Sequence, residues 1–122
     1  LIGDWVDVGT RGEFRLSLHW KIKNQLLELT TIDQNGPSIS MIRVHPKSSN
    51  IVHSGTNHVG VVTSGLWDFQ TKDGPTLAAK FVSTEGLEGE LNMQLVPQSA
   101  DTMLLRVGSQ QLSEVQLIRK AY

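Results

Sequence analysis

The chain contains no cysteine among its 122 residues. This absence excludes disulfide bonds, thiolate metal sites, iron–sulfur clusters and cysteine nucleophiles. It does not identify the compartment, and the chain begins at Leu1 instead of a methionine. A leader, an anchor or a preceding domain could have been removed. The localisation therefore stays open between a soluble cytoplasmic protein and an exported one, periplasmic or secreted.

Excess charge and long apolar runs are also missing. The 11 Lys and Arg residues against 12 Asp and Glu residues give a formal net charge of −1, and no basic run occurs. Because phosphate binding needs a surplus of positive charge, we expect no nucleic-acid partner. No apolar run approaches the roughly 20 residues that span a bilayer, so we expect no transmembrane segment.

The composition describes one folded domain. Hydrophobic residues make up 39% of the chain and charged residues 19%, whereas a disordered chain would be poorer in apolar residues and richer in net charge. A chain of this length has no room for a second core of normal size. We therefore expect a single domain over residues 1–122.

Apolar residues alternate with polar ones along most of the chain. In the segment FRLSLHWKIK, residues Phe14, Leu16, Leu18, Trp20 and Ile22 share one face. This period of two predicts a strand with one buried face, whereas a helix would scatter the same residues. We predict ten strands, near Asp4–Gly9, Glu13–Lys23, Leu26–Asp33, Ser38–His45, Ile51–Gly55, His58–Gln70, Thr76–Ser83, Glu90–Val96, Thr102–Val107 and Ser113–Lys120.

The breaks between these strands are short and carry turn residues. QNGP, HPKSSN, KDGP and VPQSAD separate successive strands, and Asn-Gly and Asp-Gly tolerate the positive φ angles of tight hairpins. Ten strands joined by hairpins would leave two exposed edges unless the sheet closes. The predicted fold is therefore all-β, a single antiparallel up-and-down β-barrel of about ten strands. A β-sandwich is the alternative, and a barrel of this size can hold a small ligand.

The opening LIGDW adds a family resemblance. A Gly-x-Trp at the start of the first strand, here Gly3 to Trp5, resembles the lipocalin-like proteins of the calycin superfamily. In that superfamily the tryptophan closes one end of the barrel and an arginine of the last strand lies across its ring, which implies these barrel-closing roles for Trp5 and Arg119. Alternation also points Arg119 to the same face as Leu117, and an indole ring can compensate an inward arginine.

The resemblance extends to small bacterial lipocalin-like domains of unknown function. They share a Leu-x-Gly-x-Trp start, a tryptophan in the second strand and a later Gly-x-Trp, which correspond here to Leu1, Gly3, Trp5, Trp20 and Gly65 to Trp67. The chain departs from typical secreted lipocalins because it lacks disulfide cysteines and a helix after the barrel. Its strand number also exceeds eight, which brings in fatty-acid-binding and nitrobindin-like barrels as relatives.

The resemblance implies that the barrel binds a small apolar or amphipathic molecule. The candidate ligand-binding residues are Trp20, Met41, Arg43, His45, Thr63, Trp67, Phe81 and Met93. The segment SISMIRVHP has two mixed faces, so its direction stays open. With Met41 inward, Arg43 and His45 would offer an acidic head group a partner. With Ile42 inward, Arg43 would face solvent.

Two histidines lie close together in IVHSGTNHVG. His53 and His58, with His45 as a third ligand, could form a metal site, or one histidine could bind haem as in a nitrobindin-like barrel. The interpretation we favour is a corner between two strands with His58 at the rim. We therefore expect no metal and no cofactor.

Two other classes of function stay open. The chain has no nucleophile elbow, phosphate loop or dinucleotide fingerprint, and we expect Glu85, Glu88 and Glu90 to lie on a solvated turn. A small barrel enzyme, isomerase-like or cyclase-like, would still need only a shaped cavity. A filled barrel would instead serve as an accessory or interaction domain, and the apolar stretch His58–Gln70 could form the face of a homodimer.

Overall fold

The computed structural model describes residues 1–9 and 13–120. These residues form ten β-strands and contain no helix. The strands are β1 (Gly3–Asp7), β2 (Arg15–Ile22), β3 (Leu26–Asp33), β4 (Gly36–Val44), β5 (Ile51–Asn57), β6 (Val62–Asp68), β7 (Thr76–Val82), β8 (Glu88–Pro97), β9 (Thr102–Gly108) and β10 (Leu112–Arg119). No helix long and apolar enough to cross a membrane occurs in this part of the chain.

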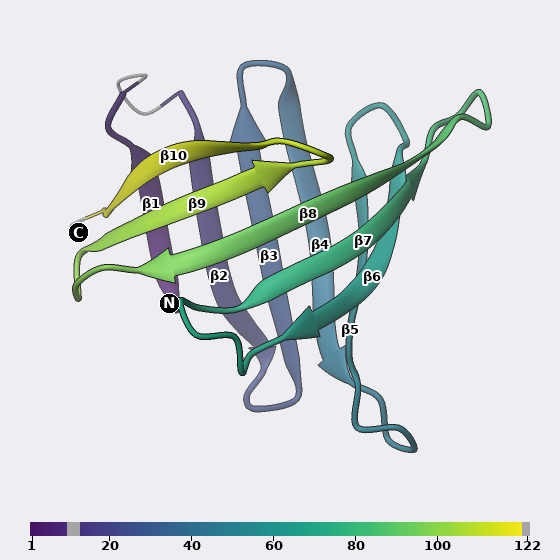
Figure 1. Cartoon of the computed structure of the whole chain (residues 1–122), viewed down its shortest axis with the longest axis horizontal. Helices are drawn as coiled ribbons and strands as arrows, with labels where there is room; N and C mark the ends of the chain where they lie inside the picture. Colours follow the sequence, from purple (N-terminus) through teal and green to yellow (C-terminus); the bar gives the residue numbers. More distant parts are fainter. Residues whose placement is uncertain (10–12, 121–122) are drawn as a thin grey trace.

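Each strand pairs in an antiparallel manner with the next, and β1 pairs with β10 (Figure 1). The sheet is therefore a closed barrel without a free edge, which is the arrangement that removes unpaired backbone groups from a large meander. The prediction of an all-β, up-and-down barrel is confirmed for the described residues. The connecting turns alternate between the two ends of the barrel.

The largest boundary difference concerns the turn between β5 and β6. The sequence predicted strands over Ile51–Gly55 and His58–Gln70, but β5 continues to Asn57 and β6 begins at Val62. The side-chain oxygen of Asn57 accepts hydrogen bonds from the backbone N–H groups of Val59 and Val61, both at 3.0 Å. The turn therefore begins after Asn57, whose side chain organises it. His53 and Asn57 both belong to β5, so the predicted corner lies later in the chain than expected.

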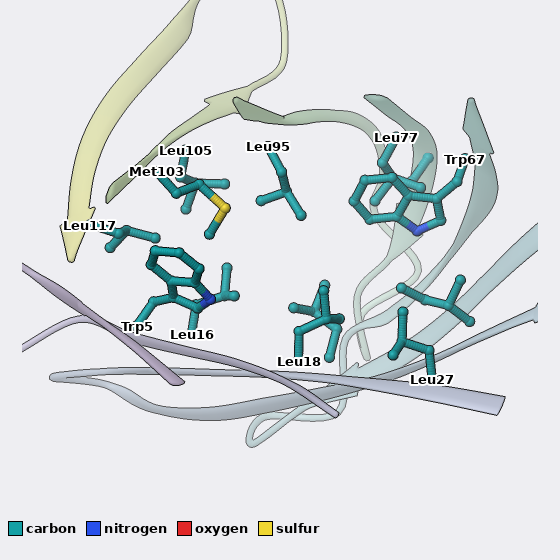
Figure 2. Packing of buried hydrophobic residues seen from close by; sticks show 13 residues of the cluster. Trp5, Leu16, Leu18, Leu27, Trp67, Leu77, Leu95, Met103, Leu105 and Leu117 are labelled. Atoms are coloured by element: carbon teal, nitrogen blue, oxygen red, sulfur yellow. The ribbon is translucent and has the colours of Figure 1, made fainter. Parts of the chain in front are cut away.

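One end of the barrel, here called the basal end, is filled by side chains. It carries the N-terminus and the turn between β8 and β9. Figure 2 shows Trp5 beside Leu16, Met103 and Leu117. The Trp5 ring is 2% exposed, and the guanidinium carbon of Arg119 lies 4.5 Å from its centroid.

Backbone contacts complete the basal end. Trp5 Nε1 donates to the carbonyl of Leu1 at 3.0 Å, and Arg119 donates to the carbonyls of Ile2 and Ala100 at 2.6 and 3.0 Å. The space left among Leu18, Trp67 and their neighbours at this end amounts to about 20 Å³. The opposite end, here called the cavity end, is not filled in this way and contains a larger cavity.

Candidate functional site: an interior cavity beside His53

A cavity of about 200 Å³ occupies the half of the barrel towards the cavity end. This volume lies below the roughly 300–1,000 Å³ of typical ligand pockets, so it suits a small molecule. Several lining residues are partly exposed, which indicates that solvent reaches the cavity. The lining consists of Phe14, Leu29, Thr31, Ser38, Ser40, His53, Thr63, Leu77, Leu91, Met93, Leu105 and Val107.

The two sides of the cavity differ in polarity. The neighbouring strands β7, β8 and β9 supply an apolar wall of Leu77, Leu91, Met93, Leu105 and Val107. The neighbouring strands β3 to β6 supply the hydroxyl groups of Thr31, Ser38, Ser40 and Thr63 together with the imidazole of His53. None of the lining residues is Asp, Glu, Lys or Arg. A molecule in the cavity would therefore meet one apolar and one polar, uncharged wall.

His53 is the one titratable side chain of this lining. It is 3% exposed, and burial lowers the pKa of its imidazole from 6.5 to about 4. The Trp67 indole Nε1 donates a hydrogen bond to His53 Nδ1 at 3.1 Å, and the two ring centroids are 6.0 Å apart. His53 is therefore neutral near neutral pH, because protonation would require charge in a desolvated place.

The hydrogen bond also determines the tautomer of His53. An indole N–H can only donate, so Nδ1 must carry the lone pair and Nε2 must carry the proton. Nε2 makes no hydrogen bond within the part of the chain that the structure describes. No fully buried polar side-chain atom in this part lacks a partner, so Nε2 retains accessible surface. Since His53 lines the cavity, its Nε2–H is a donor available there.

Two glycines make this arrangement possible. Gly65 on β6 pairs with His53, and a Cβ at Gly65 would overlap the Ala78 carbonyl oxygen and Ala79. Gly55 on β5 pairs with Ser40, and a Cβ there would overlap the Ser40 hydroxyl group. The absence of side chains at these positions lets the strands approach closely and leaves room for the polar wall.

Four of the predicted ligand-binding residues lie in or near this half of the barrel. Thr63 and Met93 line the cavity. Trp67 is buried below it and contacts His53. Phe81 is outside the lining, and its ring covers Gly89 at the start of β8.

The other four predicted ligand-binding residues lie elsewhere. Trp20 is 44% exposed near the basal end of β2. His45 is exposed after β4, where its Nδ1 accepts the backbone N–H groups of Lys47 and Ser48 at 3.2 and 3.4 Å. Met41 and Arg43 are on the outer face of β4, since the alternate residues Ser40 and Ile42 are buried.

Two arrangements that the sequence left open, a metal site and an activated nucleophile, can be compared with the described residues. No group of three His, Cys, Asp or Glu side chains suited to a metal occurs in residues 1–9 and 13–120. His58 lies in the exposed turn after β5, away from the cavity lining. No hydrogen bond connects Ser40 with His53 among the described contacts, so the serine lacks the activation that a nucleophile needs. The arrangement brings together hydroxyl groups, one imidazole and an apolar wall.

His53 and Ser40 are two of the cavity-lining residues that the predicted ligand-binding set did not include. Alternation had placed Trp67 inward, and His53 lies opposite Gly65, which shares the Trp67 face. Cross-strand partners project to the same side of a sheet, so the register of one hairpin would have placed His53 inside. That register depends on the turn length, which the sequence did not define.

Comparisons of the chain with family models, with curated proteins and with solved structures gave no match. The function therefore has to be argued from the cavity itself. The homodimer face predicted over His58–Gln70 stays a prediction, and the exposed apolar residues of that stretch that lie on β6 are Val62 and Leu66.

Proposed function

We propose that the protein reversibly binds a small apolar or amphipathic molecule inside the barrel. The observation that carries the proposal is a cavity of about 200 Å³ with one apolar and one hydroxyl-bearing wall. A core that existed only for stability would fill this space, because side chains that line an open space lose packing contacts. A bound molecule would recover that packing.

A relationship to the lipocalin-like barrels of the calycin superfamily supports this function. The closed antiparallel barrel, the initial Gly-x-Trp and the cation–π contact of Arg119 with Trp5 agree with the family resemblance. These features concern the filled basal end. The ligand would enter through the other end, where the lining residues are partly exposed.

Mass spectrometry of the purified protein tests the proposal. Under native conditions we expect an added mass that disappears on denaturation, and its formula identifies the ligand. Val107→Phe places a larger side chain in the cavity lining, so this variant should lose the added mass. Val82→Phe, at an exposed position on β7, is the matched control and should keep it.

Two results would contradict ligand binding in the barrel. One is a bare mass in the wild-type protein combined with amide NMR spectra that small apolar solutes leave unchanged. The other is an added mass that survives in Val107→Phe and disappears in Val82→Phe, since this would place the ligand on the outer surface. The first result, a bare mass with unchanged spectra, would favour the alternative function of an accessory domain whose barrel binds no ligand.

A further inference from the structure

We infer that the cavity selects an uncharged molecule with a hydrogen-bond acceptor, and that His53 Nε2–H donates to this acceptor. The inference rests on the proposed function and adds the chemical class of the ligand and the anchoring atom. It uses three features of the described residues: the fixed tautomer of His53, the unused donor, and the lack of charge around the cavity.

The contact with Trp67 makes His53 a donor towards the cavity. A metal ion or haem iron binds an imidazole nitrogen through its lone pair. In neutral His53 that lone pair is on Nδ1, where it accepts the Trp67 hydrogen bond of 3.1 Å. The nitrogen towards the cavity carries the proton, so it suits a carbonyl, ether or hydroxyl oxygen better than a metal.

The donor is placed where an acceptor gains most from it. His53 is 3% exposed and its neighbours in the lining include Leu29 and Leu77. An N–H that keeps only part of its accessible surface in such surroundings makes fewer hydrogen bonds with water than it would in bulk solvent. A ligand oxygen can restore one of these bonds, while the apolar part of the ligand contacts the opposite wall.

The surroundings disfavour a charged ligand. A buried carboxylate requires a cation or several donors as compensation. The lining contains no Lys or Arg, Arg43 is exposed on the outer face of β4, and Arg106 contacts Glu114 and Gln94 at 3.2 Å each. A fatty-acid-like head group would therefore find hydroxyl donors but no cation inside this half of the barrel. The volume further limits the ligand to about the size of a single ring.

Three solutes of similar shape test the inference. Cyclohexanone carries an acceptor, methylenecyclohexane replaces the oxygen by carbon, and cyclohexanecarboxylate carries a charge. Each is titrated near neutral pH into the full chain, and the amide NMR signals of the cavity residues give the dissociation constant. For the wild type we expect cyclohexanone to bind about tenfold more tightly than either of the other two.

Two variants isolate the contribution of the donor. His53→Leu removes the donor and keeps an apolar side chain, so the preference for cyclohexanone should disappear and methylenecyclohexane should bind at least as tightly, because the ketone oxygen then loses water without gaining this partner. His58→Leu changes an exposed histidine in the turn after β5 and should keep the tenfold preference. If His53→Leu does not fold, the ¹⁵N signal of His53 Nε2 in the wild type replaces it, and cyclohexanone should shift that signal.

The outcomes separate this inference from the proposed function. If no solute perturbs the cavity residues, both the cavity-binding function and the donor role are wrong. If the hydrocarbon binds as well as the ketone and the Nε2 signal does not move, the cavity binds ligands but His53 does not anchor them. Tighter binding of the carboxylate would overturn the uncharged class while leaving the cavity-binding function in place.

Discussion

At the residue scale, His53 shows how a buried polar side chain is stabilised in an apolar barrel. Its Nδ1 accepts the indole hydrogen bond of Trp67, and on the same hairpin His53 pairs with Gly65 and lies two residues before Gly55. Burial disfavours the imidazolium form and holds the pKa at about 4. His53 therefore offers a neutral N–H donor near neutral pH. Because its pKa is lowered by folding, the free energy of unfolding should also depend on pH.

We predict that His53 makes the protein less stable as the pH falls from about 6.5 to about 4. In this range an unfolded chain binds a proton at His53, whose ordinary pKa is 6.5, whereas the folded protein does not. Proton uptake then favours unfolding, and the loss should approach on the order of 3 kcal/mol before it levels off below about pH 4. Urea unfolding at several pH values measures this slope.

The comparison of two leucine variants assigns that slope to His53. The slope should flatten in His53→Leu, in which the group is absent, and persist in His58→Leu, because His58 is exposed. His19, His45 and the carboxylates are present in all three proteins. Parallel pH profiles of the wild type and His53→Leu would show that His53 is not buried in its neutral form.

At the element scale, alternation predicted where strands occur better than which way they face. Leu16 and Leu18 on β2 are unambiguous because their alternate neighbours are polar. On β4, Ile39, Met41, Ile42 and the serines give two mixed faces, so the sequence could not choose between them. The pairing of Leu29 with Ser40 decides the question, since β3 already has a buried leucine face and cross-strand partners share a side.

Close approach of β6 and β7 depends on Gly65. We predict that Gly65→Ala lowers the free energy of unfolding by about 1–3 kcal/mol, because the new methyl group would overlap the backbone at Ala78 and Ala79. Thermal or denaturant unfolding measures the change. Ser64→Ala, at the adjacent exposed position, is the control and should change stability by about 0.5 kcal/mol or less. If both substitutions changed the free energy of unfolding equally, β6 and β7 could move apart at Gly65 without a loss of stability.

At the scale of the whole molecule, the barrel divides into a filled end and a hollow end. Trp5 and Arg119 belong to the first and last strands and are direct partners in the β1–β10 pairing that closes the sheet. Their contact therefore stabilises both the closure of the barrel and the basal plug. The cavity lies in the other half, so stability and ligand binding are expected to respond to different substitutions.

Alanine substitutions of two tryptophans test whether Trp5 stabilises the closed barrel. Trp5→Ala should lower the free energy of unfolding by about 3 kcal/mol or more, as for other fully buried aromatic side chains. Trp20→Ala removes a tryptophan that is 44% exposed, and we expect a loss of about 1 kcal/mol. Denaturant unfolding compares the two. A Trp5→Ala protein with an unchanged melting temperature would exclude the plug role of Trp5.

Local sequence patterns were enough to predict the class of fold and the number of strands. Repeated period-two patterns, interrupted by segments such as QNGP and KDGP, are local signals, and each strand can be read from its own neighbours. Even so, the boundary at Asn57 depended on a side chain that folds back on its own turn. Local patterns therefore predicted the elements to within a few residues.

The identity of the residues that form the site depends on how the barrel closes. His53, Ser40 and Leu105 are far apart in the sequence and meet because ten strands close in one register. The same closure places Met41 and Arg43 outside, although their chemistry suits a pocket. Side-chain direction reverses with every one-residue change in register, and the space left unfilled depends on all walls together. A cavity is thus a property of the assembled barrel, and no single strand encodes it.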